Sequence, residues 1–435
     1  MSEKRAVLVV CDGLRADLLR PELTPNLCRL AARGRRFVNH RGVFPSTTRT
    51  TSASISTGCH PARHGLQGNA VALDEGEGLV PLTAGAPDFC DRLRKATGKT
   101  LQVPTVAERV KDHGGAVVFS NVSPGAAYFQ DPDGFGHVYH RSGSYGPGLA
   151  AITGADHLDV THDYTGDTAM TDRFIEEVLH ERKPAAAVLW QCEPDHSQHE
   201  YALGAPEHLE ALAAADANAG RVADAVAKLN AAGEDILLLI ASDHGHETVR
   251  NIIDLEAMLI EAGFKESPDS HDCVVASQGL SAFIYLSDEA QPRKAEIAKW
   301  LKGQAGIGSI HMGDRLAELG QRTDGALAIA VDGAKSAERN EFGVTGLSDA
   351  FFNRFSTKTA MGNGQHGGLG LNEQNPFLII IGRGFEAGTL HGDASSAVDI
   401  APTVLTHLGL PAGGMDGAPL QGDMDGAPLQ PSGGA

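Results

Sequence analysis

The stretch AVLVVCDG, residues 6–13, joins a short apolar run to an aspartate and a glycine. A short apolar run bounded by polar or turn residues predicts a buried β-strand. Four more runs have the same character: AVVF (116–119), AAAVLW (185–190), ILLLIA (236–241) and FLIII (377–381). We predict that all five runs are buried parallel strands.

Helical patterns alternate with these runs. In TPNLCRLAARG, Thr24 is a candidate N-cap and Pro25 occupies the first helical position. In TVAERVKDHGG, Thr105 and Glu108 have the spacing of a capping box. The Ala-rich residues 207–229 predict a long helix. Strands that alternate with helices favour an α/β fold, a doubly wound and mostly parallel sheet.

The rest of the chain suggests an insertion, two loops and a tail. The patterns SAFIYLS, AEIAKWLKG and ALAIAVD predict strands and a helix outside the main alternation, and the motif MDGAPLQ occurs twice near the end. Residues 70–102 and 121–165 are rich in Gly, Pro and Asp, so we expect long loops there. Our interpretation is a core of residues 1–274 and 356–412, an inserted α+β cap domain of residues 275–355, and a flexible tail of residues 413–435.

Composition restricts the partners. The chain has 435 residues, 42% of them hydrophobic, and a formal net charge of -19. That charge repels polyanions, which argues against a nucleic acid polymer or an anionic membrane as the main partner, whereas a small anionic substrate fits if cations reverse the charge locally. No apolar run approaches the ~20 residues of a membrane span. The six scattered cysteines form no C-x-x-C, and with no signal sequence in MSEKRAVLVVCDG we expect reduced thiols and a cytoplasmic protein, compatible with a homo-oligomer.

Three aspartates follow predicted strands: Asp12 in VVCDG, Asp195 in CEPDHSQHE and Asp243 in IASDHGHE. Ligands of open α/β sheets bind beyond the carboxyl ends of the strands. Three carboxylates gathered there need cations to balance their charge. A single Asp after a strand is more often a cap or turn residue, so the prediction depends on their joint occurrence.

Histidines accompany these aspartates. His199 follows Asp195 by four residues, His244 adjoins Asp243, and His366 lies in the Gly-rich GNGQHGGLG. A mixed Asp/His set suits Zn²⁺, with Mn²⁺ as the alternative. A lone His in a Gly-rich loop is commonly only exposed, and we expect His246 of DHGH to be a structural neighbour rather than a ligand.

The motifs DG, PSTT…TG…HG, PDxxxH, SDHG and GxHG occur in an order that resembles the nucleotide pyrophosphatase/phosphodiesterase branch of the alkaline phosphatase superfamily, and also phosphonoacetate hydrolase, a close relative. The motifs extend from Asp12 to His366, nearly the whole predicted core. The resemblance implies an alkaline phosphatase-like core and a metal-dependent hydrolase of phosphodiester or pyrophosphate bonds in small substrates.

The resemblance also implies roles for residues. Thr48 is the expected nucleophile, which forms a phosphothreonine that water activated at a metal then hydrolyses, and Asn69 of HGLQGN is the expected donor to a phosphoryl oxygen. Two divalent metal ions are implied. The ligands would be Asp12, Thr48, Asp243 and His244 for one ion, and Asp195, His199 and His366 for the other.

The segment FPSTTRTTSAS, residues 44–54, supports Thr48 on chemical grounds. A free hydroxyl is a poor nucleophile, and no His or carboxylate lies near Thr48 in sequence, so a metal is its natural activator. Ala53, Ile55 and the Gly58 stop predict a short helix that begins near Thr48. The N–H of Arg49 at that helix start would then point at the transferred group.

Two departures affect the substrate. Arg49 stands where nucleotide-cleaving relatives commonly carry an aromatic residue; it could bind a second phosphate or a carboxylate, stack on a ring, or be solvated. The lysines that bind carboxylate in phosphonoacetate hydrolase have no counterpart in FSNVSPG, where Asn121 is the candidate instead. His137, His140 and Arg141 on the following loop are further candidates for substrate binding, although exposed residues without a role fit equally well.

Competing functions remain. A phosphonate hydrolase or a phosphomonoesterase of the same superfamily would use the same ligands. A sulfatase is disfavoured because no C/S-x-P-x-R motif replaces Thr48, and a mutase-type isomerase is disfavoured because those relatives use Ser. An inactive metal-binding regulatory module is the alternative from another class, against which the intact set of ligands and nucleophile argues.

Overall fold

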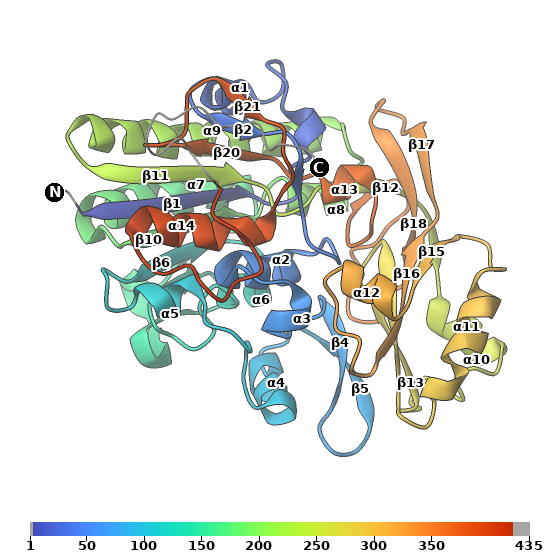
Figure 1. Ribbon diagram of the computed structural model, residues 1–435. Helices are drawn as coiled ribbons and strands as arrows, with labels where there is room; N and C mark the ends of the chain where they lie inside the picture. The colour runs from blue at the N-terminus through green and yellow to red at the C-terminus, as the bar shows by residue number, and fades with distance from the viewer. Residues whose placement is uncertain (1–2, 421–435) are drawn as a thin grey trace, which may run out of the picture.

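A ten-stranded sheet crosses the molecule in the computed structural model, which describes residues 3–420. Figure 1 shows the sheet on the left and smaller sheets on the right. Adjacent strands at its centre are parallel, as predicted. They are β11 (Asp235–Ala241), β1 (Lys4–Cys11), β10 (Ala186–Gln191), β6 (Ala116–Ser120) and β7 (His137–His140). The fold is therefore α/β with a mostly parallel central sheet, as expected for an alkaline phosphatase-like core.

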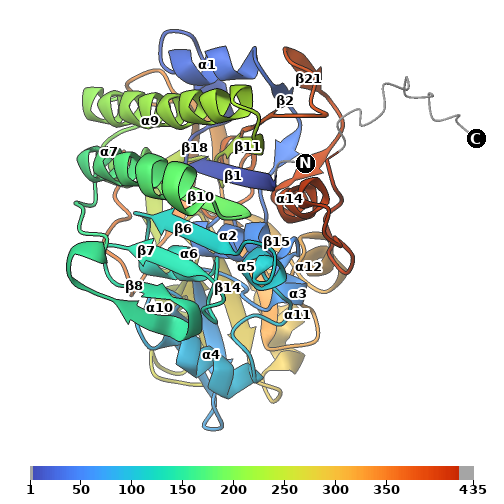
Figure 2. The same cartoon turned by 90° about the vertical axis from the view of Figure 1, so that its left-hand side faces the viewer.

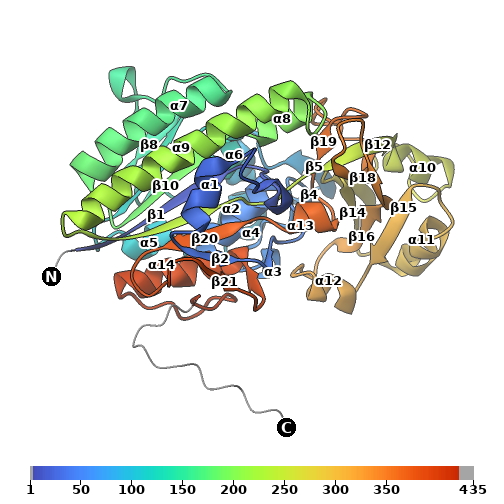
Figure 3. The same ribbon diagram turned by 90° about the horizontal axis from the view of Figure 1, so that it is seen from above.

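Helices cover both faces of the sheet, as Figures 2 and 3 show. Val7 and Val9 of β1 pack with α9 (Pro206–Ala231), whereas Leu8 and Val10 pack with α14 (Ile400–Leu408) on the other face. Successive strand residues point to opposite faces, so a strand covered on both faces must be apolar throughout. This requirement explains the unbroken run AVLVV.

One strand direction differs from the prediction. β20 (Leu378–Ile381), the run FLIII, pairs antiparallel with β11 and with β2 (Arg35–Phe37). Its preceding segment, with His366 and α13 (Leu371–Gln374), already lies at the carboxyl end of the sheet, so the chain can only run back. An apolar run carries no information on direction, which is set by the connection before it.

The two expected long loops contain regular structure. Residues 70–102 include a hairpin of β4 (Ala70–Asp74) with β5 (Leu79–Thr83), and helix α4 (Phe89–Thr97). Residues 121–165 contribute β7, β8 (Ser144–Gly146) and β9 (Ala150–Ile152) to one edge of the main sheet. Their Gly and Pro residues mark turns between short elements rather than one continuous loop.

A second layer lies at the carboxyl end of the main sheet (Figure 1). One antiparallel sheet has the order β13 (Cys273–Ser277), β14 (Ser281–Leu286), β16 (Leu327–Gly333), β15 (Ile307–His311). The other has the order β17 (Lys335–Arg339), β18 (Thr345–Phe351), β12 (Glu247–Ile253), β19 (Gly364–Gln365). Because β12 follows SDHG and β19 precedes His366, this second sheet joins the layer to the site. The domain boundaries drawn from the sequence stay a prediction.

The start of the expected tail makes specific contacts. Asp416 accepts the N–H of His60 at 2.9 Å and pairs with Arg63, and the N–H of Ala418 donates to Asp399 at 2.8 Å. The second copy of MDGAPLQ lies outside the described residues. No helix within residues 3–420 is long and apolar enough to cross a membrane.

The remaining elements are short. The other strands are β3 (His40–Arg41), β21 (Thr389–His391) and β22 (Ser395–Ser396). The other helices are α1 (Pro25–Ala31), α2 (Thr48–Thr57), α3 (Pro61–His64), α5 (Val106–Val110), α6 (Pro124–Tyr128), α7 (Tyr164–Arg173, continued as a wider helix over Phe174–Arg182), α8 (Asp195–Glu200), α10 (Leu255–Glu261), α11 (Lys294–Leu301) and α12 (Asp314–Glu318), with short 3-10 turns at Ala16–Leu18, Pro147–Leu149, Gly154–Asp156, Gln291–Arg293 and Ala397–Asp399.

Candidate metal centre and active site

Three aspartates meet at the carboxyl ends of three adjacent strands. Asp12 follows β1, Asp195 follows β10, and Asp243 follows β11, and β1 lies between the other two strands. The N–H of Asp195 donates to the carbonyl of Asp12 at 3.0 Å. Parallel strands end at one edge of the sheet, which is why residues 183 positions apart are neighbours.

Asp12, Asp243 and His244 form a first donor group. Nε2 of His244 lies 3.6 Å from Oδ1 of Asp12 and 3.1 Å from Oδ2 of Asp243. Both of these carboxylate oxygens are buried without a hydrogen-bond partner. The opposite oxygens accept the indole N–H of Trp190 at 2.9 Å and the N–H of Gly13 at 3.0 Å. Each carboxylate is thus oriented through one oxygen, and the other is free to bind a cation.

Thr48 borders this first group. It is the first residue of α2, is only 6% exposed, and its Oγ1 lies 3.1 Å from Nε2 of His244. The helix ends at Gly58, whose φ of 66° is a left-handed value that glycine adopts without strain. The short helix expected from FPSTTRTTSAS is therefore present, and its N-terminus directs the Thr48 hydroxyl at the donors.

Asp195, His244, His246 and His366 form a second donor group, in which His244 is shared. Oδ1 of Asp195 lies 2.7 Å from Nε2 of His246 and 3.6 Å from Nε2 of His366. Nε2 of His199 is 3.4 Å from the same oxygen. The structure thus brings the expected ligands together and places His246 in the same donor group; its expected role as a structural neighbour rather than a ligand stays a prediction.

Burial controls the charge of these groups. Burial, together with Asp243 and Asp195, raises the pKa of Asp12 well above its ordinary value. Burial also acts on Asp195, but His199 and His246 outweigh it and hold the pKa of that carboxyl well below its ordinary value. Burial lowers the pKa of His246 to about 3 and so keeps the ring neutral, the form in which histidine binds metals.

The donors fit divalent cations. Unpaired buried carboxylate oxygens beside neutral imidazoles are costly unless a positive charge lies between them. Mixed Asp/His groups match zinc and related ions. The residues of the two groups could hold one ion each, with Thr48 next to the first.

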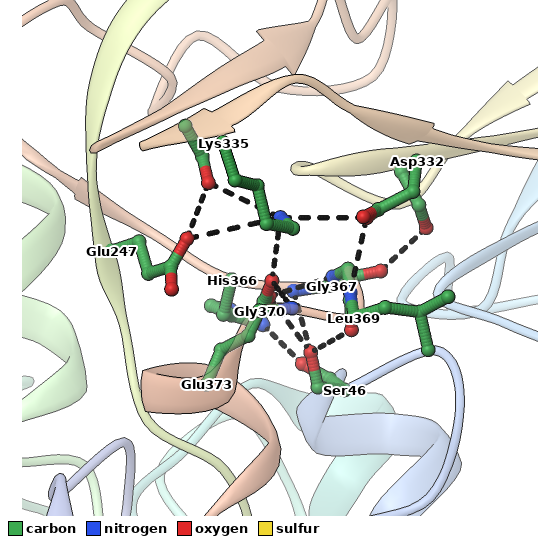
Figure 4. A network of polar contacts seen from close by, with 12 residues as sticks. Ser46, Glu247, Asp332, Lys335, His366, Gly367, Leu369, Gly370 and Glu373 are labelled. Atoms are coloured by element: carbon green, nitrogen blue, oxygen red, sulfur yellow. Dashed lines mark hydrogen bonds and ion pairs between the residues drawn. The ribbon is translucent and has the colours of Figure 1, made fainter. Parts of the chain in front are cut away.

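The loop that carries His366 is tied to the segment before Thr48 (Figure 4). Nδ1 of His366 lies 2.7 Å from the carbonyl of Ser46, an arrangement that leaves Nε2 for a metal. The Ser46 hydroxyl donates to Glu373 at 2.9 Å, and Glu373 also accepts the N–H groups of Gly368 and Gly370. One carboxylate therefore positions both the loop of His366 and the segment before Thr48.

Lys335 is the cation of this network. Its Nζ lies 2.9 Å from Glu373, 3.4 Å from Asp332 and 3.8 Å from Glu247. Burial raises the pKa of Asp332 to about 7, against the lowering effect of Lys335. No motif marked Lys335 in the sequence, because its partners come from three separate elements.

A cavity of about 400 Å³ opens beside the donors. Its lining includes Asp12, Asp195, His199 and His366, the nucleophile candidate Thr48, and Arg49, Asn69 and Arg141. The second layer and the segment after β18 contribute Ser277, Gln278, Gly279, Asn353, Phe355, Ser356, Lys358 and Thr359. These last residues were missed in the sequence, where nothing distinguishes them from ordinary surface residues.

The expected donors near Thr48 differ in detail. The N–H of Arg49 does not point at a transferred group but donates to Oδ1 of Asn69 at 3.2 Å. The N–H of Asn69 donates to Gln278 at 2.8 Å, so a residue between β13 and β14 holds this turn. With its oxygen occupied, the side chain of Asn69 keeps its amide nitrogen for a ligand.

Three candidate substrate-binding residues do not line the cavity. Asn121 is buried and donates to Thr161 and Asp167, and His140 is buried with Nε2 2.8 Å from the carbonyl of Val122. His137 stacks on Tyr139. Of the candidates on and after β6, only Arg141 reaches the cavity.

Comparisons with known proteins identify similar folds and a family. No curated protein sequence matched. Solved structures with similar folds include murine ectonucleotide pyrophosphatase/phosphodiesterase 5, as an inactive threonine-to-alanine variant in complex with AMP, at 16% identity and a TM-score of 0.69 over 96% of this chain and 98% of that one. Phosphonoacetate hydrolase from Sinorhizobium meliloti 1021 in complex with phosphonoformate matches at 18% identity and a TM-score of 0.66 over 94% and 96% of the two chains. The family model of type I phosphodiesterase/nucleotide pyrophosphatase matches residues 6–309, and the chain therefore belongs to this family.

Proposed function

We propose that this chain hydrolyses phosphodiester or pyrophosphate bonds of a small phosphorylated substrate, with Thr48 as nucleophile and two divalent cations as cofactors. The observation that carries the proposal is the position of the Thr48 hydroxyl: at the start of α2, 3.1 Å from Nε2 of His244, and open to a cavity bordered by both donor groups. Family membership makes the enzyme a phosphodiesterase/pyrophosphatase-type hydrolase.

The proposed ligands are those expected from the sequence. Zn²⁺ is the first choice of ion and Mn²⁺ the alternative. When bound, the ions would supply Lewis-acid charge to a hydroxyl and to phosphoryl oxygens. One ion would be held by Asp12, Thr48, Asp243 and His244, and the other by Asp195, His199 and His366.

The side chains carry the reaction in two displacements. Oγ1 of Thr48 bonds to phosphorus while the bond to the leaving oxygen breaks, the hydroxyl proton is lost, and the leaving group gains a proton. Water then attacks the phosphothreonine, which restores the threonine and releases the phosphoryl product. The amide nitrogen of Asn69 would donate to a non-bridging oxygen during both displacements.

The neighbours favour a small phosphoryl substrate. One holds AMP and the other phosphonoformate. A phosphonate hydrolase or a phosphomonoesterase remains the second candidate, because the metal ligands and the nucleophile would be unchanged. A cytoplasmic location and compatibility with a homo-oligomer stay predictions from the sequence, and an inactive metal-binding regulatory module stays the disfavoured alternative from another class.

The test compares Thr48→Ala with Thr48→Ser. Purified proteins are assayed on bis-p-nitrophenyl phosphate, p-nitrophenyl phosphate and p-nitrophenyl phenylphosphonate, and their metal content is measured by mass spectrometry. We expect about two divalent ions per chain, loss of all turnover in Thr48→Ala with metal retained, and partial turnover in Thr48→Ser. Wild-type turnover rates rank the three chemistries. Turnover at the wild-type rate in Thr48→Ala would refute the nucleophile, and wild-type protein without bound metal would refute the cofactors.

A further inference from the structure

We propose that Arg49 and Arg141 form a second anion subsite beside the reacting centre, so that the substrate carries a second oxyanion, a carboxylate or a phosphoryl group, in addition to the phosphoryl group that is attacked. The inference rests on the proposed function for the place of the first phosphoryl group. It goes further by naming a charge that the substrate must have.

The guanidinium of Arg49 lies in a narrow slot. A Cβ added to Gly85 would collide with this guanidinium, and one added to Gly125 would lie 3.0 Å from its Nε. Nε of Arg49 is buried and has no hydrogen-bond partner. The absence of side chains at the two glycines leaves the slot just wide enough for the arginine, which also lines the cavity.

Arg49 forms no ion pair within residues 3–420, and the acidic residue whose charge acts on it is the metal donor Asp195. Arg49 is partly buried, and its buried Nε without a partner costs free energy that a bound anion would recover. A planar guanidinium can donate two parallel hydrogen bonds to the paired oxygens of a carboxylate or a phosphoryl group. The alternative is an arginine at a helix start that is solvated and has no role. Such an arginine would have its Nε in water, whereas the Nε of Arg49 is buried.

Arg141 follows β7 and contacts the segment after β6, which Arg49 also contacts. Its Nη1 donates to the carbonyls of Asn121 at 3.1 Å and Val122 at 2.9 Å, while Arg49 contacts Gly125 a few residues on. Backbone carbonyls hold the guanidinium in place and leave its full charge unneutralised. Arg141 has no ion pair among the described residues either, and it lines the cavity with Arg49.

Lys358 adds a third cation to the cavity wall. It is exposed, lies in the segment after β18, and forms no ion pair in the described part of the chain. Arg49, Arg141 and Lys358 are the lysine and arginine residues of the cavity lining, and the metal donors Asp12 and Asp195 are its acidic residues. The cavity lining therefore combines acidic residues that could hold cations with cationic side chains that could bind an anionic group of the substrate.

Matched ligands isolate the second oxyanion. Ethylphosphonate and 3-phosphonopropionate differ by a carboxylate, and methylphosphonate and methylenediphosphonate differ by a second phosphoryl group. Titration calorimetry on the metal-loaded wild-type protein gives an affinity ratio for each pair. A charge-assisted hydrogen-bonded contact stabilises by about 1.5–3 kcal/mol, so we expect at least one pair to show a ratio of about tenfold or more. The arm with the larger ratio identifies the group as carboxylate or phosphoryl.

Variants of the arginines test whether these side chains cause the affinity ratio of each ligand pair. Arg49→Met should reduce it to about one and leave the affinity for the simple phosphonate unchanged, and Arg49→Lys should keep part of it. Arg383→Met removes one exposed charge far from the cavity and should keep the whole ratio. Melting temperature and metal content are measured for each variant. If Arg49→Met does not fold, Arg141→Met and the wild-type ratios decide.

The outcomes separate the two proposals. Ratios near one in the wild-type protein, or an equal loss of affinity for both members of a pair in Arg49→Met, would overturn the subsite even if diesters are hydrolysed. Ratios that depend on Arg49 in a protein that hydrolyses no phosphoryl substrate would uphold the subsite and reject the proposed function.

Discussion

Replacing Lys335 by methionine should destabilise the contact between the second layer and the loop that carries His366. Lys335 is the cation that faces Glu247, Asp332 and Glu373, at 3.8, 3.4 and 2.9 Å. Methionine has a similar length and no charge, so the substitution removes the ion pairs with little change in packing. The three carboxylates then lie close together without a counter-charge.

The size of the effect follows from two opposing terms. At these distances each ion pair gains about 4–6 kcal/mol at an effective dielectric constant of about 20. Desolvation of the buried charges offsets most of that gain, and removing one partner of a buried ion pair typically costs about 3–5 kcal/mol. The unfolding entropy of a chain of 435 residues is about 0.9 kcal/mol/K, so we expect the melting temperature to fall by roughly 3–6 °C at pH 8.5.

The effect should depend on pH. The pKa of Asp332 in the folded protein is about 7, above its ordinary value of 3.8, so the folded state binds a proton that the unfolded state does not between these two values. Loss of Lys335 raises that pKa further, since Lys335 lowers it. The loss of folding stability caused by Lys335→Met is thus largest above pH 7. It becomes smaller as the pH falls and Asp332 becomes neutral.

Thermal unfolding, followed by circular dichroism at pH 8.5 and pH 6.0, measures the stability lost in Lys335→Met at the two pH values. Lys302→Met, an exposed lysine of the same layer, should change the melting temperature little at either pH. Lys335→Arg keeps the charge and should recover part of the loss. An equal deficit at both pH values, or a melting temperature like that of Lys302→Met, would refute the electrostatic reasoning.

Three further predictions concern the metal centre. Trp190→Phe removes the N–H that holds Oδ2 of Asp12 at 2.9 Å, so metal retained after dialysis should correspond to about 10–100-fold weaker affinity; unchanged retention would show that this hydrogen bond does not orient the carboxylate. Chelation of the wild-type protein should lower its melting temperature, because the buried carboxylates lose their counter-charge, and Zn²⁺ or Mn²⁺ added back should restore it; a melting temperature insensitive to chelator contradicts the metal assignment. Arg15→Met removes two bonds from a fully buried guanidinium to the carbonyls of His246 and Thr345, at 3.1 and 2.9 Å, and should lower both metal retention and melting temperature, whereas a loss of stability alone would show that Arg15 does not position His246.

The sequence alone was sufficient for the main elements and for the order of the motifs. Apolar runs such as residues 6–10 and 236–241 mark central strands because a strand covered on both faces must be apolar at every position. Asp12 and Asp243 could be placed at one sheet edge because parallel strands end together. These inferences depend only on local periodicity and on a general property of α/β sheets.

The tertiary structure decided the direction of β20 and which distant residues meet at the candidate metal centre. The run 377–381 reads the same in either direction, and β20 is antiparallel because its preceding segment already lies at the far edge of the sheet. His246 joins the second donor group through packing that no spacing rule expresses. Periodicity reports which face of an element is buried, whereas the partner across that face depends on how distant segments pack.

The substrate end of the cavity shows the same division. The sequence singled out Arg49 by its place after Thr48 but left three readings open: an anion clamp, a stacking group or a solvated side chain. The structure placed Arg49 in a slot between Gly85 and Gly125, without an ion pair in the described residues. Whether a charged side chain is paired depends on every segment that surrounds it, so only the folded chain could show that this arginine lacks a partner.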